Sequence, residues 1–183
     1  MNITRRIALK NLLIVAAGTT LLPACFQDDK KASLGLRHLR ISGDQEKTLA
    51  DLTETIIPTT DTPGAKDISA HLFVLKMVDD CYTREEQDAF MKGFETFGKQ
   101  VQQKYNKPFE ECSQTEKEAF LTALEKEEDG ENPIRSFYKS TKGLTVFGYT
   151  TSQYYLTQVK GYNIIPGKYR GAVQVNSPKP SNT

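Results

Sequence analysis

Three short stretches of the chain carry the pattern that starts an α-helix, and they constrain the fold more than any other feature. In each, a Ser or Thr is followed three residues later by Glu or Gln: Ser42 and Gln45, Thr83 and Glu86, Ser113 and Glu116. In such a capping box each side chain binds a backbone N–H group that the first helical turn leaves unpaired. Apolar residues follow at helical spacing, most clearly between Phe90 and Tyr105. Repeated helix starts, with almost no alternating β-branched pattern before residue 160, predict an all-α fold.

These signals divide the chain into a small bundle of five to six helices with an extended C-terminal tail. The expected helices cover about residues 43–57, 68–82, 84–105, 114–126, 133–147 and 152–159. The second is apolar nearly all round, which is typical of a central helix. We expect a helical domain over residues 42–175 and a loose C-terminus over residues 176–183.

The stretch from Ile56 to Asp67 connects the first two expected helices. Pro58 disfavours helical backbone at the residue before it, and Pro63 fixes φ just before Gly64. Asp67 is expected to cap the second helix. Alone, such a stretch is typical of an interhelical loop. A second marked stretch, Phe147-Gly-Tyr-Thr-Thr-Ser152, lies near the C-terminus.

Residues 1–24 have the features of an export signal. Arg5 and Arg6 precede an apolar run from Leu12 to Leu22, which is shorter than the about 20 residues that span a membrane. The paired arginines resemble a twin-arginine signal, although Ala8 stands where a large apolar residue is usual. Because that route exports folded proteins, it suits a protein that leaves the cytoplasm with its cofactor or partner in place.

The signal ends in Leu22-Pro-Ala-Cys25, which resembles a bacterial lipobox. Cys25 would then become the first residue and carry acyl chains, and several chains hold a protein on a membrane where one would let it leave. We expect a lipoprotein on the periplasmic side of a membrane, with residues 25–41 as a tether. The alternative is an ordinary cleaved signal with an incidental cysteine.

The mature chain would have 159 residues, 183 less the 24 of the signal, which suits one domain with a real core. Loss of Arg5, Arg6 and Lys10 changes the formal charge from +1 to −2. That balance provides no basic footprint for nucleic acid.

The sequence shows no catalytic constellation. His38 and His71 have no Cys or carboxylate at metal-binding spacing, so we expect a surface and a packed histidine, respectively. The chain has no Cys-x-x-Cys-His haem motif, no dinucleotide-binding glycine pattern and no Gly-x-Ser-x-Gly elbow. Cys81 and Cys112 lie on either side of a long helix, so we expect at least one of these thiols to be free, buried or paired with another chain.

Tyrosines are concentrated in the last third of the chain, at positions 138, 149, 154, 155, 162 and 169. A Tyr ring can bury area while its hydroxyl stays hydrogen-bonded, which suits a contact surface. Packing of the last helix onto the bundle would use the same residues, and the sequence leaves both readings open.

Taken together, these stretches resemble the gluconate 2-dehydrogenase subunit 3 family. The matching motifs, in chain order, are Ile57-Pro58, Asp61 to Ala65, Asp79-Asp80, Phe90 to Phe97, Gly148 to Ser152, and Pro166 to Tyr169. The resemblance covers about residues 49–171. It departs at Cys25, which many relatives lack, and at Gln153, where an acidic residue is expected.

The resemblance implies a non-catalytic small subunit of a membrane-associated flavin dehydrogenase. Its partner would be an FAD-dependent large subunit of the glucose-methanol-choline oxidoreductase type, with a cytochrome c subunit as a possible third component. The chain itself would hold no cofactor. The resemblance places the partner interface at Asp61, Pro63, Gly64, Tyr149, Thr151, Tyr155 and Tyr169.

Two other classes stay open at this point. A lipid-anchored carbohydrate-binding module would use the tyrosines to stack on sugar rings. A catalytic chain of unrecognised type would turn over a substrate without flavin.

Overall fold

The computed structural model describes residues 32–126, 132–165, 167 and 172. Within these residues the chain forms five α-helices: α2 (Gly43–Ile56), α3 (Ala70–Cys81), α4 (Arg84–Tyr105), α5 (Gln114–Lys126) and α6 (Pro133–Thr150). A 3-10 turn, η3 (Phe109–Glu111), precedes α5, and a short π-helical segment, η4 (Tyr155–Val159), follows α6. The described residues contain no β-strand, so the predicted all-α class is confirmed. The expected signal, with Arg5, Arg6 and Cys25, lies outside the described residues.

Four of the helices, α2, α4, α5 and α6, start where the capping patterns predict. The Ser42 and Thr83 hydroxyls accept the N–H groups of Gln45 and Glu86, and both capping boxes are complete. The Ser113 hydroxyl accepts the Glu116 N–H at 3.3 Å in the same way. At the start of α6, the Asn132 side chain accepts the Ile134 N–H and Pro133 occupies the first turn. These contacts are local, which is why the sequence predicts them well.

The start of α3 differs from the prediction. The helix begins at Ala70, and its N-cap is Ser69, which has left-handed backbone (φ 57°) and makes no side-chain cap. The expectation that Asp67 caps this helix was therefore wrong. Its carboxylate is bound instead to Gly64 and Thr59 of the preceding loop.

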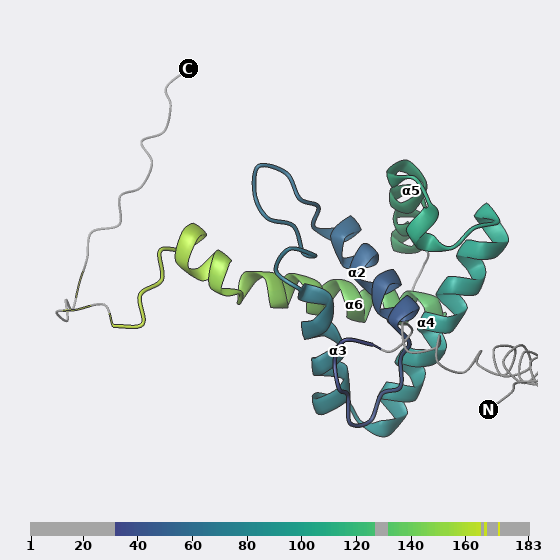
Figure 1. The fold of residues 1–183 in the computed structure, drawn as a ribbon, viewed down its shortest axis with the longest axis horizontal. Coiled ribbons are helices and arrows are strands. Elements are labelled where there is room, and N and C mark those ends of the chain that lie inside the picture. The colour runs from purple at the N-terminus through teal and green to yellow at the C-terminus, as the bar shows by residue number, and fades with distance from the viewer. Residues whose placement is uncertain (1–31, 127–131, 166, 168–171, 173–183) are drawn as a thin grey trace, which may run out of the picture.

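The central helix is α6, not α3 as the sequence suggested. It packs against α2, α3, α4 and α5, and Figure 1 shows it running through the middle of the molecule. α3 buries one face, through Val74, Leu75 and Val78, while Leu72 and Phe73 stay half-buried. The sequence shows apolar residues nearly all round α3, which indicated a fully buried helix. In the structure α3 lies at the edge of the bundle, and the apolar residues off its buried face are only partly covered.

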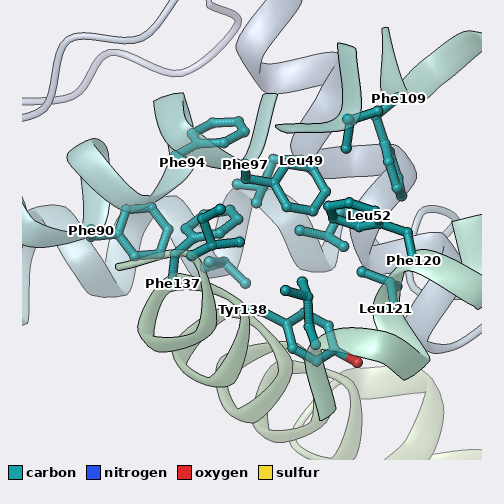
Figure 2. Packing of buried hydrophobic residues seen from close by; sticks show 14 of the residues in the cluster. Leu49, Leu52, Phe90, Phe94, Phe97, Phe109, Phe120, Leu121, Phe137 and Tyr138 are labelled. Carbon is teal, nitrogen blue, oxygen red and sulfur yellow. The ribbon is translucent and has the colours of Figure 1, made fainter. Parts of the chain in front are cut away.

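An aromatic cluster around Phe137 forms the core. The Phe137 ring stacks on Phe94 at 4.9 Å between centroids and meets Phe90 edge-on at the same distance. Phe97 lies 5.6 Å away and also contacts Phe120 at 5.5 Å. Figure 2 shows these rings between α4 and α6. These contacts join α4 to the first half of α6 and, through Phe120, to α5.

Residues 32–41 lie against the bundle, although we expected them to belong to the tether. Leu39 is 6% exposed and is part of the core, and Leu34, Leu36 and Ile41 pack partly buried against it. The first part of the expected tether, residues 25–31, lies outside the described residues.

Candidate functional site

The two marked stretches of the sequence meet through one hydrogen bond. The Tyr149 hydroxyl, near the end of α6, donates to the Pro63 carbonyl oxygen at 2.7 Å. Eighty-six positions separate the two residues. The bond attaches the loop between α2 and α3 to the C-terminal part of the central helix, so the two stretches form one site.

The loop over residues 58–69 is held in shape by two carboxylates. Glu54 accepts the N–H groups of Thr59 at 2.7 Å and of Lys66 at 2.9 Å. Asp67 accepts the Gly64 N–H at 2.9 Å, and its Oδ2 lies 2.7 Å from the Thr59 hydroxyl. The Thr59 hydroxyl and the Gly64 N–H lower the pKa of Asp67 below its ordinary value, because both favour the ionised carboxylate. The loop is thus pre-organised before any partner binds.

Gly64 is buried inside this loop, at a position where no larger residue fits. A Cβ atom there would lie 2.5 Å from the Thr59 backbone nitrogen and 2.6 Å from Glu54 Oε1. The site therefore needs a glycine for close packing between the loop and the end of α2.

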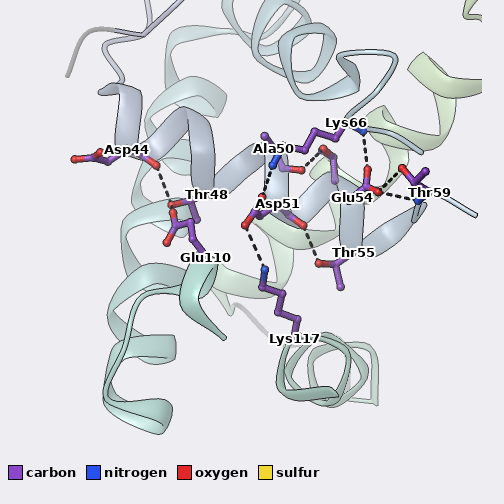
Figure 3. A network of polar contacts seen from close by, with 11 residues as sticks. Asp44, Thr48, Ala50, Asp51, Glu54, Thr55, Thr59, Lys66, Glu110 and Lys117 are labelled. Atoms are coloured by element: carbon purple, nitrogen blue, oxygen red, sulfur yellow. Dashed lines mark hydrogen bonds and ion pairs between the residues drawn. The ribbon is translucent and has the colours of Figure 1, made fainter. Parts of the chain in front are cut away.

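An ion-pair network fastens the base of the loop to two helices. Asp51 of α2 contacts the ammonium groups of Lys66 at 2.8 Å and Lys117 at 3.2 Å. Burial alone would raise the pKa of Asp51, but the two lysines lower it below its ordinary value. Figure 3 shows this network along α2 together with Glu54 and Thr59. The loop is therefore tied to α5 as well as to α2.

Tyrosines pack the chain beyond α6 onto the helix end. The Tyr149 ring lies 6.4 Å from that of Tyr154 and 6.0 Å from that of Tyr155, both at steep angles. Tyr138 is buried in the core, where its hydroxyl donates to Glu125 at 2.6 Å. Four of the clustered tyrosines thus serve internal packing, whereas Tyr162 is 57% exposed.

Every exposed large apolar side chain in the described part of the protein lies in one segment, residues 146–165, which we call the C-terminal arm. These side chains are Val146, Phe147, Val159, Tyr162, Ile164 and Ile165. Phe147 is 51% exposed and Ile164 is 82% exposed. Figure 1 shows the arm projecting from the bundle beyond α3. A concentration of exposed apolar side chains of this kind marks an interaction surface.

The arm joins the bundle at a close helix crossing. Gly148 of α6 lies against the Phe73 ring of α3, where an added Cβ would be 2.6 Å from Phe73 Cδ1. The Phe73 and Phe147 rings meet edge-on at 5.7 Å. Phe147 therefore stands in a fixed position on α3 while half of it faces solvent.

The structure describes six of the seven predicted interface residues, and all six lie in the loop over residues 58–69 or in the C-terminal arm. Asp61 and Thr151 are exposed, Pro63, Tyr149 and Tyr155 are half-buried, and Gly64 is buried. Tyr169 lies outside the described residues. Direct contacts join Tyr149 to Pro63 and to Tyr155. Their role in binding a partner stays a prediction.

The sequence named Phe147 and Tyr162 of the arm and Asp67 of the loop, but it did not single out the other exposed apolar side chains of the arm or Glu54, the second carboxylate that braces the loop. Val146 and Phe147 lie off the buried face of α6, which a helical projection could have indicated. Glu54 gave no such signal, because its partners lie five and twelve residues away across a turn.

The described residues contain no group of three or more His, Cys, Asp or Glu side chains that could hold a metal ion. Cys81 is exposed and Cys112 buried, and both are free thiols, as we expected of at least one. Over the same residues, no helix combines the length and the apolar character needed to cross a membrane.

Fold and site together define a small all-α protein whose marked residues build a braced loop beside an exposed apolar arm. The chain belongs to the gluconate 2-dehydrogenase subunit 3 family, whose sequence pattern matches residues 43–167. This match contains both the loop and the whole of the arm. Searches of curated proteins and of solved structures gave no match.

Proposed function

We propose that this chain is the non-catalytic small subunit of a membrane-associated flavin dehydrogenase, which it helps to export, stabilise and tether. Its family supports a role as one subunit of such a complex. The partner would be an FAD-dependent large subunit of the glucose-methanol-choline type, with a cytochrome c subunit as a further component. The FAD belongs to the partner.

The observation that carries the proposal is that, among the residues that the structure describes, the exposed large apolar side chains are confined to the C-terminal arm. An isolated protein gains nothing from Phe147, Ile164 and Ile165 in water, whereas a partner that covers them gains about 25 cal/mol for each Å² of apolar surface buried. Hydrogen bonds from Glu54 and Asp67 brace the loop beside the arm, which lowers the conformational entropy that binding would cost there. Asp61 and Thr151 supply exposed polar groups for the rim of such an interface.

Binding of carbohydrate gains less support from the geometry. Stacking on a sugar needs an exposed ring face, but Tyr149, Tyr154 and Tyr155 are half-buried and pack on one another at 63° to 69°. These three tyrosines therefore fit the attachment of the arm better than a sugar platform, which leaves Tyr162 as an exposed ring of the described residues.

The expected N-terminal signal is the basis for the export role in this proposal. A twin-arginine signal on a subunit that binds a folded flavoprotein would carry both proteins out of the cytoplasm. Lipid on Cys25 would then keep the complex on the periplasmic side of a membrane.

The test is to replace Arg5 and Arg6 by lysine and to measure flavin dehydrogenase activity in periplasmic, membrane and cytoplasmic fractions. The expected result is that the flavoprotein stays in the cytoplasm, because lysines keep the charge but do not form the paired-arginine signal. Replacing Lys99, an exposed residue of α4 outside the signal, by arginine also keeps the charge and is the control that should leave export unchanged. Normal export of every flavoprotein in the double variant would contradict the escort role.

A further inference from the structure

The end of the C-terminal arm stands clear of the bundle. We call residues 157–165 the tip, and all nine of them are exposed. Figure 1 shows the tip at the yellow-green end of the ribbon, extending away from α3 and the other helices. The hydrogen bonds that these residues make in the described part of the chain all go to other residues of the arm. No side of the tip therefore rests on the bundle.

Apolar side chains occur on more than one side of the tip. Val159 is 53% exposed and Tyr162 is 57% exposed, while Ile164 and Ile165 are 82% and 77% exposed. The two isoleucines are adjacent, and neighbouring side chains point in different directions whether the backbone is helical or extended. A flat surface laid against the tip would cover one isoleucine far better than the other. Burial of both needs a surface that closes round the segment.

The backbone of the tip is held in shape by the arm itself. The Lys160 N–H donates to the Tyr155 carbonyl oxygen at 2.9 Å, and the Tyr162 N–H donates to the Leu156 carbonyl oxygen at 2.7 Å. Because these N–H groups already have acceptors, pairing with an edge strand of another protein would break bonds that the arm makes. Recognition of the tip therefore depends on its side chains.

The tip carries a single charge. Lys160 is its one charged residue, and the whole arm contains no Asp or Glu. The Lys160 ammonium group lies 5.9 Å from the centroid of the Tyr155 ring, at cation–π distance. Burial of an ammonium group without an opposite charge is costly. A protein surface that encloses the tip therefore needs an acidic group beside Lys160.

We infer that a cleft of the flavoprotein closes round the tip, with apolar walls for Ile164 and Ile165 and a carboxylate beside Lys160. This inference rests on the proposed function and deepens it, since that function names the partner but neither the shape nor the charge of its surface. The hydrocarbon of a membrane fits the tip less well. Beyond Val159, where η4 ends, the backbone is irregular, and lipid would leave its polar groups without the hydrogen bonds that a protein cleft can supply.

The experiment measures how far the two neighbouring isoleucines are covered in the complex. Ile164→Cys and Ile165→Cys are made singly in the full chain with Cys81→Ser, and the rate of reaction with a charged maleimide is measured. Cysteine is small and apolar, so each variant keeps an apolar side chain at its position. The complex purified from membranes is compared with the chain produced alone, in the same detergent. Lys99→Cys, at an exposed position of α4, is the control site, and the Cys81→Ser chain gives the background.

Both cysteines of the tip should react about tenfold or more slowly in the complex than in the chain alone, because the core of an interface excludes water. Lys99→Cys should react at the same rate in both samples. Protection of only one cysteine of the tip would overturn the inference in favour of a flat contact, and protection of neither would remove the tip from the interface.

A lipid occupant is tested on the chain alone. Vesicles of phosphatidylcholine and phosphatidylglycerol are added without the flavoprotein, and both cysteines of the tip should keep the reaction rate of the chain alone. Protection of both by these vesicles would assign the tip to lipid and overturn the inference.

Lys160→Gln tests the acidic group of the cleft, and Lys160→Arg, which keeps the charge, is the matched control. Loss of the charge should lower recovery of the flavoprotein by about tenfold at low salt, because the partner's carboxylate is left unpaired. The difference between the two variants should narrow as salt is added, since ions screen the attraction. Equal recovery with both variants at low salt would overturn the assignment of a carboxylate beside Lys160.

Failure of the proposed function would be seen separately. A chain that brings down no flavin-containing protein has no such partner, and this is visible before any labelling. A recovered flavoprotein together with a reactive cysteine at position 164 or 165 would contradict the cleft alone.

Discussion

The hydroxyl of Tyr149 donates to the carbonyl oxygen of Pro63 across 2.7 Å, and this single bond joins the loop between α2 and α3 to the end of the central helix. Both residues belong to the stretches that the sequence marks. The bond brings two motifs that lie far apart in the chain into contact.

Tyr149→Phe tests this connection. It removes the hydroxyl and leaves the ring contacts, so the unfolding free energy should fall by about 0.5–1.5 kcal/mol. Recovery of the partner should fall as well, because the loop loses its attachment to the arm. Denaturant unfolding and co-purification measure the two effects. Tyr162→Phe removes the hydroxyl of an exposed ring and should change stability by much less; equal effects of the two variants would contradict the account.

Gly64→Ala should distort the loop. The new methyl group would lie 2.5 Å from the Thr59 nitrogen, so the loop must shift, at a cost of about 1–3 kcal/mol. Gly98→Ala is the control, since a Cβ there meets nothing within 4 Å and alanine favours the helix by about 0.5–1 kcal/mol. Thermal unfolding of both variants gives the comparison. A Gly64→Ala protein as stable as the wild type would show that the close packing is not required.

Phe147→Ser tests the C-terminal arm. Because half of this ring faces solvent and the other half packs on Phe73, the substitution should lower the unfolding free energy by about 1–2 kcal/mol and leave the bundle folded. Partner recovery should fall about tenfold or more if Phe147 is an anchor of the interface. Lys99→Ser, an exposed change on α4, should leave recovery unchanged. Full recovery of the partner with Phe147→Ser would remove this residue from the interface.

The pH dependence of stability should contain a contribution from Glu116. Lys107, at 2.8 Å, and the Ser113 N–H and hydroxyl lower the pKa of Glu116 from 4.5 to about 2. Because the folded pKa is the lower one, the ionised group stabilises the folded protein above pH 4.5, and this contribution is lost as the pH falls toward 2.

Glu116→Gln should therefore be less stable than the wild type at pH 7, with a difference that shrinks as the pH approaches 2. Urea unfolding over this pH range measures it, and Glu118→Gln, on the exposed side of α5, is the control. A difference between Glu116→Gln and the wild type that does not vary with pH would contradict this assignment.

Local signals predicted the helices, and tertiary contacts decided the rest. The pair Thr83 and Glu86 gave the start of α4, because both partners of each bond lie within one turn. α6 ends at Thr150, three residues beyond the end that we expected at Phe147. Gly148 packs closely on Phe73 within the helix, and the helix continues past this glycine.

The site was harder to predict because it depends on tertiary contacts between residues that lie far apart in the chain. Asp67 stands where a helix cap is expected, but its carboxylate is hydrogen-bonded to the Thr59 hydroxyl and the Gly64 N–H instead of to the first turn of α3. The family motifs named Pro63 and Tyr149, but only the fold shows that they touch. The attachment of residues 37–39 to Asp79 joins segments some forty residues apart and left no periodic trace in the sequence.

The central claim is that this small subunit binds a flavoprotein, and the most direct measurement is purification from membranes through a tag placed after Thr183. The account predicts that a second, larger chain is recovered with it and that the sample shows the absorption spectrum of bound FAD. It also predicts that the flavin absorption per tagged chain drops with Phe147→Ser and stays constant with Lys99→Ser. Recovery of the tagged chain alone, colourless and without a second protein, would contradict the account.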